Sequence, residues 1–123
     1  MRLTNNVLGV MLAVIALPAS AQSTRQPSPY EMALAAGYKA TITCGAVFVA
    51  GRTEAQIAAD ELNGIYPEYT AIVPTLTATI DQRTRAVSVP FAPDLPPRIA
   101  VWSPRTGCTT PVSYTHLTLP TKA

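Results

Sequence analysis

The chain has 123 residues, enough for one small domain. Nine Lys and Arg against seven Asp and Glu leave a formal net charge of +2, a balance that indicates neither a nucleic-acid-binding protein nor an acidic surface. The hydrophobic fraction of 48% is ordinary for a globular protein, and the N-terminal segment raises it.

That N-terminal segment has the pattern of a secretory signal peptide. Arg2 supplies a positive charge, residues 7–17 (VLGVMLAVIAL) form an apolar run, and Pro18 precedes three small residues that end at Ala21. This order predicts cleavage after Ala21 and an exported protein, periplasmic or secreted. The alternative is a transmembrane anchor, which requires about 20 apolar residues. The run is too short, so we expect no stable membrane anchor after cleavage.

The first predicted helix starts at Pro29, after a capping residue. Ser28 is a good N-cap, proline suits the first helical position, and Glu31 completes a capping box. The apolar residues that follow predict helix through Ala36, and Gly37 either ends the helix or lies inside it. The β-branched residues after that glycine also fit a strand, because periodicity does not separate the two in a short apolar run. We favour helix.

A second helix is predicted within residues 51–64 (GRTEAQIAADELNG). Thr53 is its N-cap, Gln56 stands three residues on, and the Asn-Gly pair ending at Gly64 is a left-handed stop. One helix face carries Ile57, Ala58 and Leu62. Two prolines then bracket a predicted loop over residues 65–74.

The rest of the native region predicts strands. Residues 75–91 alternate as a β-hairpin does around a polar turn at 81–84, residues 98–104 read as a third strand, and a turn at 105–107 leads into Cys108. The expected fold class is therefore α+β, with a helical N-terminal part followed by a three-strand antiparallel meander, in an incomplete domain.

The two cysteines, Cys44 and Cys108, leave two alternatives open. In an exported protein the pair suits a disulfide, which would close a long loop and stabilise the fold by about 4 kcal/mol in the chain-entropy model. The other alternative is two separate thiols, since spacing alone does not establish connectivity.

The C-terminal segment differs from the rest of the chain. Residues 112–121 (VSYTHLTLPT) back-translate to GTC TCT TAT ACA CAT CTG ACG CTG CCG ACG, the reverse complement of a transposon-end adapter used in sequencing libraries. The preceding Pro111 also fits the adapter. We interpret residues 111–123 as a non-native, adapter-derived tail, so His116 carries no function. The alternative is a genuine short C-terminal strand.

Residues 22–110 contain no histidine, which excludes a Ser-His-Asp or Cys-His site there and leaves no zinc-binding set. The segment also has no S-x-x-K sequence and no glycine-rich phosphate loop. We therefore predict no catalytic, metal-binding or cofactor-binding residue in this chain, and no cofactor.

Carboxylates and tyrosines are the remaining candidates. Asp60 and Glu61 are neighbours and point about 100° apart on a helix, while Glu54 lies two turns away, so a solvated helix face is favoured over an acid/base pair. The tyrosines do not alternate with basic residues as in a nucleic-acid stacking platform, so we expect them in packing. They are Tyr30, Tyr38, Tyr66 and Tyr69.

Three stretches together carry a family resemblance. Residues 36–62 contain a cysteine followed by Phe-x-x-Gly-Arg before an acidic helix, residues 78–91 an Ile-Asp hairpin, and residues 96–110 the pattern Arg-x-Ala-x-x-x-Pro-x-x-Gly-Cys-Thr. In order and spacing they resemble the N-terminal part of β-lactamase-related serine hydrolases. This family includes penicillin-binding-like proteins, class C-like β-lactamases, esterases and 6-aminohexanoate-dimer hydrolases. The resemblance covers residues 31–110.

The resemblance implies a serine of an S-x-x-K motif that attacks an amide or ester carbonyl, assisted by the lysine and a tyrosine. In the family these residues follow the matched region, so none is transferred to a position here. We expect residues 22–110 to be the N-terminal portion of an exported serine hydrolase, inactive alone, whose partner is the missing C-terminal catalytic region. The alternatives are a complete small periplasmic binding or structural protein with one disulfide, and a small secreted enzyme that uses Asp60 or Glu61.

Overall fold

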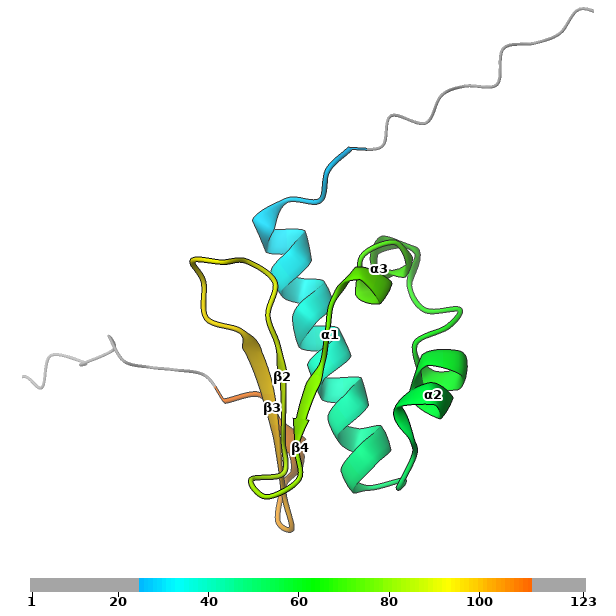
Figure 1. Cartoon of the computed structure of the whole chain (residues 1–123), viewed down its shortest axis with the longest axis vertical. Helices are drawn as coiled ribbons and strands as arrows, with labels where there is room; N and C mark the ends of the chain where they lie inside the picture. Colours follow the sequence, from blue (N-terminus) through cyan, green and yellow to red (C-terminus); the bar gives the residue numbers. More distant parts are fainter. Residues whose placement is uncertain (1–24, 112–123) are drawn as a thin grey trace, which may run out of the picture.

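The computed structural model describes residues 25–111, in which a long helix packs against a four-strand antiparallel sheet (Figure 1). The predicted signal peptide and residues 112–123 of the predicted tail lie outside the described residues. The fold class is α+β, as predicted. In chain order the elements are α1 (Pro29–Phe48), α2 (Glu54–Gln56), η1 (Ile57–Glu61), α3 (Pro67–Thr70), η2 (Val73–Thr75), β1 (Thr79–Asp81), β2 (Ala86–Val89), β3 (Arg98–Ser103) and β4 (Gly107–Thr109).

Helix α1 begins with the predicted capping box and runs to Phe48. The backbone N–H of Glu31 donates to the Ser28 hydroxyl at 3.2 Å, and the backbone N–H of Ser28 donates to the Glu31 carboxylate at 2.7 Å. Gly37 lies inside the helix, so the preference for helix over strand is confirmed. Tertiary packing explains the length, because the residues that α1 buries are small and let it approach the sheet closely. They are Ala33, Ala35, Ala36, Ala40, Thr43, Cys44 and Ala46.

The second predicted helix is present, but it is wound in two ways. Thr53 and Gln56 form the predicted capping box, and α2 leads directly into η1, a π-helix. The i→i+5 bonding of a π-helix displaces side chains from their α-helical positions. Ile57 is buried, whereas Ala58, predicted on the same face, is exposed. Gly64 has φ +64°, which confirms the left-handed stop.

The segment predicted as a proline-bracketed loop contains two short helical turns instead. Helix α3 begins at Pro67, and the 3-10 turn η2 carries Pro74 at its start. Proline suits such positions because the first turn of a helix needs no N–H donor there. The two turns bring Tyr69 against α1 and place Val73 in the core.

The sheet has one strand more than predicted. The hairpin of β1 and β2 is confirmed, with Ile80 paired to Val87, and β3 adds to β2. β4 then follows the predicted turn and pairs Cys108 with Trp102, giving the order β1-β2-β3-β4. The expected three-strand meander is therefore wrong by one strand. A three-residue strand is too short for its alternation to be read from sequence.

The core lies between α1 and the sheet. Val87, Val89 and Ala100 are fully buried on the sheet face that meets α1, and Ile72, Val73 and Leu76 close the core from the η2 side.

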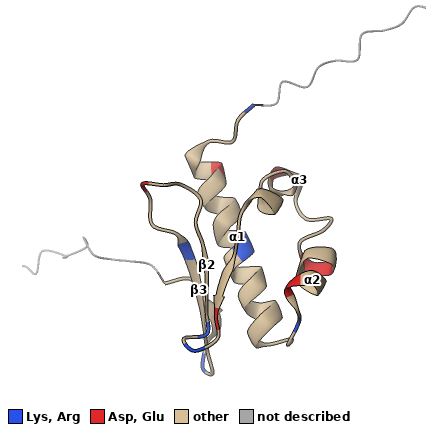
Figure 2. Ribbon diagram, viewed as in Figure 1, with Lys and Arg blue, Asp and Glu red and all other residues tan. Residues whose placement is uncertain are grey.

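Charged residues are spread over α1, α2, the turns and β3 in Figure 2. No helix within residues 25–111 has both the length and the apolar character needed to cross a membrane.

Two apolar surfaces stay outside this core. The sheet residues that alternate with the buried ones face away from α1, where Ala86 pairs with Val101 and Ser88 with Ile99. On α1 the exposed fractions are 71% for Tyr30 and 41% for Leu34, and Val49, the residue after the helix, is 70% exposed. A helix that is apolar on most sides is typically covered on more than one side. These are the surfaces on which a further layer could pack.

Candidate functional site

Cys44 and Cys108 are joined in a disulfide, which decides between the two alternatives that spacing left open. The bond is 2.05 Å long, the Cα atoms are 6.1 Å apart, and the bridged residues are separated by 64 positions. Cys44 is fully buried on α1, and Cys108 lies on β4. The bridge therefore ties β4 to the C-terminal part of the long helix, and its role is structural.

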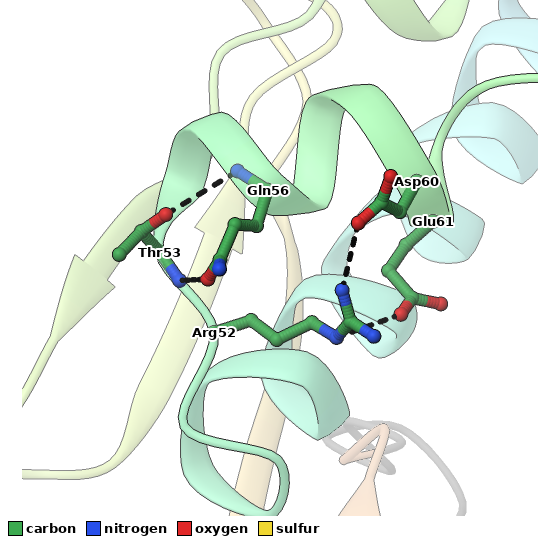
Figure 3. Close-up of polar contacts among 5 residues, drawn as sticks. All are labelled: Arg52, Thr53, Gln56, Asp60 and Glu61. Carbon is green, nitrogen blue, oxygen red and sulfur yellow. Dashed lines mark hydrogen bonds and ion pairs between the residues drawn. The ribbon is translucent and has the colours of Figure 1, made fainter.

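Asp60 and Glu61 converge on one cation, contrary to the expectation that they diverge (Figure 3). Arg52 Nη1 donates to Asp60 Oδ2 at 2.9 Å, and Arg52 Nε lies 3.1 Å from Glu61 Oε1. The long arginine side chain spans the angle between the carboxylates, and its planar group offers separate donors to each. All three side chains are more than a third exposed, so the cluster is a surface ion-pair network.

Lys39 is an internal cation that sequence reasoning did not single out. It is partly buried on α1, and its Nζ donates to the carbonyl oxygens of Val73 at 3.1 Å and Leu76 at 2.5 Å. Desolvation by burial lowers the pKa of Lys39 below its usual value. The signal in the sequence was one lysine within an otherwise apolar helix. Its contacts hold the η2 turn against α1.

A cavity of about 250 Å³ lies next to Lys39. Thr43, one turn further along α1, lines it with a hydroxyl that is buried and has no hydrogen bond within the described residues. The remaining wall is mostly aliphatic, from Ile57, Leu62, Leu76, Ala78 and Ile80. Glu54 borders the same cavity and takes no part in the ion pairs of Asp60 and Glu61 with Arg52.

Three of the four predicted tyrosines gather on the side of α1 that faces α3. The ring centroid of Tyr38 lies 6.2 Å from that of Tyr66 and 5.2 Å from that of Tyr69, and the last two are 6.1 Å apart. Tyr66 stands nearly perpendicular to both others, at 78° and 88°, whereas Tyr38 and Tyr69 are inclined by only 37°. The expectation of packing holds for this cluster, while Tyr30 lies outside it and is mostly exposed.

The three rings, which we call the tyrosine corner, border two adjoining hollows of about 430 Å³ each. The first runs along α1 and ends at Arg98 and Thr110. The second is lined by Leu34, the tyrosine corner, and the two carboxylate residues Glu31 and Glu68. Together they form a groove with apolar walls, one basic end and one acidic end.

Glu31, at the acidic end, is ionised at neutral pH. Hydrogen bonds from the backbone and side chain of Ser28 lower the pKa of Glu31, with a further contribution from Arg25. Glu68 lies in the first turn of α3 and forms no ion pair within residues 25–111. At the basic end, the Arg98 guanidinium lies 5.8 Å from the centre of the Phe91 ring.

The groove is lined mostly by aromatic, aliphatic and charged side chains. Within the described residues, its lining holds no cysteine thiol, no histidine and no serine beside a base, and no group of three or more His, Cys, Asp and Glu residues is arranged to hold a metal ion. No protein-family model, curated protein or solved structure matches this chain.

Proposed function

We propose that residues 22–110 are the N-terminal portion of an exported serine hydrolase that cleaves amide or ester bonds through an acyl-serine intermediate. The observation that supports this most is how the three stretches of the family resemblance meet. The first contributes Cys44 and the third Cys108, which are bonded, and the second is the β1–β2 hairpin that pairs with the third through β3. Stretches far apart in sequence thus form one unit.

In this proposal the described unit is a scaffold layer and the chemistry comes from the C-terminal catalytic region. A serine there would attack the substrate carbonyl and pass its proton to the lysine–tyrosine pair. The pair would return that proton to the amine or alcohol as its bond to the carbonyl carbon breaks, and water would then hydrolyse the acyl-serine ester. Two features suit such a partner region: the outer face of the sheet carries Ala86, Ile99 and Val101, and Val49 is exposed just after the end of α1. The chain is expected to be inactive alone.

The test begins by reading the source DNA through the Thr110 codon and onward. The proposal expects the adapter string to vanish and the frame to continue into an S-x-x-K motif. The extended protein should then be labelled by a serine-reactive acylating probe, such as a fluorescent fluorophosphonate or penicillin. Its S-x-x-K serine-to-alanine variant and the present chain are the matched controls, and neither should be labelled. A native stop codon after residue 123 would overturn the proposal.

A complete small binding protein is the second candidate, and the groove beside α1 is the observation that favours it. The two candidates differ in stability as well as in reading frame. A unit that leaves apolar surface for a missing region should be only marginally stable for its size. A sharp, cooperative thermal transition of purified residues 22–110 would favour the complete protein.

A further inference from the structure

We propose that the tyrosine corner, with its two carboxylates, is a binding site for a quaternary or fully methylated ammonium group. The site is formed by Tyr38 on α1, Tyr66 immediately before α3 and Tyr69 within α3. It opens into the hollow of about 430 Å³ whose rim carries Glu31 and Glu68. The proposal is independent of the hydrolase assignment, because none of these residues is given a role in that chemistry.

Three aromatic side chains line the hollow that such a cation would enter. A ring face carries negative electrostatic potential and attracts a cation within about 6 Å of its centre. Tyr66 is nearly perpendicular to the other two rings, so the three form a corner rather than a parallel stack. Leu34 closes the apolar side of the hollow. The methyl groups of a quaternary ammonium suit an aromatic and aliphatic lining, because they are apolar and the positive charge is delocalised over them.

The surrounding charges favour a cation over a neutral ligand of the same shape. Glu68 lies at the rim without an ion pair among the described residues, while Glu31 is ionised but shares its charge with Arg25. Arg98 borders the other hollow, and Arg25 is ion-paired with Glu31 at the rim of this one. A primary ammonium is less suited, because it would lose strong hydration on entering apolar walls without gaining matching hydrogen bonds.

The site is shallow, so we expect weak binding, with a dissociation constant in the millimolar range. The test uses the full chain and follows tyrosine resonances by NMR during titration with choline chloride, at constant total ionic strength. 3,3-Dimethylbutan-1-ol is the control ligand, because it has the same shape without the charge. We expect saturable shifts of the Tyr38, Tyr66 and Tyr69 resonances with choline and none with the alcohol.

Variants distinguish the corner from nonspecific binding. Tyr66 is 63% exposed, so Tyr66→Ala should keep the fold and weaken choline binding about two- to fivefold or more, whereas Tyr66→Phe should keep it. Tyr30→Ala is the matched control, since Tyr30 is 71% exposed and outside the corner. Glu68→Gln, which retains the walls, should also weaken binding. The proposal would be overturned by equal binding of choline and the alcohol or by the absence of a saturable shift with choline. It would also be overturned if Tyr30→Ala and Tyr66→Ala changed choline binding equally.

Discussion

Removal of the Cys44–Cys108 bridge should lower the free energy of unfolding by about 4 kcal/mol. The bridge closes a loop with a sequence separation of 64 residues, and the chain-entropy model assigns about that value to a loop of this length. The whole free energy of unfolding of a small domain is about 5–15 kcal/mol. The bridge therefore supplies a large share of the stability, and without it the described unit should be close to unfolding.

The assay is urea unfolding monitored by Trp102 fluorescence and circular dichroism, on the oxidised protein, the reduced protein and the Cys44→Ala/Cys108→Ala variant. With a slope of about 2 kcal/mol per molar urea, the midpoint should fall by about 2 M. The reduced protein keeps both sulfur atoms, so comparison with the variant separates loop closure from lost packing at the buried Cys44. Reductant should not affect the variant. A midpoint shift below about 0.5 M would refute the reasoning.

Three further predictions concern individual polar side chains. Lys39→Met should lower the free energy of unfolding by about 1–3 kcal/mol at pH 7 in urea titrations, because the Val73 and Leu76 carbonyls lose their donor. Because the pKa of Lys39 is lowered in the folded state, the unfolded chain binds more protons than the folded chain in the pH window just below 10.5. The stability of the wild type should therefore rise with pH in that window, and the Lys39→Met variant should lack this rise. Hydrogen bonds from the backbone N–H groups of Thr84 and Arg83 lower the pKa of Asp81. The ionised carboxylate therefore stabilises the fold above pH 3.8, and this contribution should fade as the pH drops through the folded-state pKa. In an acid titration, Asp81→Asn should lose less stability than the wild type does. Thr53→Ala should lower the free energy of unfolding by about 1 kcal/mol, because the backbone N–H of Gln56 loses its acceptor. Thr77 is exposed and caps no helix, so the control Thr77→Ala should change thermal stability little.

Local features of the fold could be predicted from sequence because their causes lie within a few residues. The caps at Ser28 and Thr53 need only a hydroxyl and a partner three positions on, and both are present. The hairpin follows from alternation around a polar turn, and Gly64 ends its helix because glycine tolerates positive φ. The resemblance to serine hydrolases rests on motifs of the same local kind, and it stays a proposal.

Other features depend on which distant segments meet, and the tertiary structure alone decided them. The β-branched part of α1 is helical because small residues there pack against the sheet, which outweighs local strand preference. Lys39 finds its carbonyl partners 34 and 37 residues away.

At the candidate site, too, the residue types could be read from the sequence, whereas their contacts depended on the tertiary structure. Residues 22–110 contain four tyrosines, yet their spacing could not indicate that Tyr38 meets Tyr66 and Tyr69. That contact requires α3, a four-residue helix inside a predicted loop, to fold against α1. The disulfide is the clearest example, since two cysteines in a sequence are compatible with a bridge, and only the approach of β4 to α1 forms it.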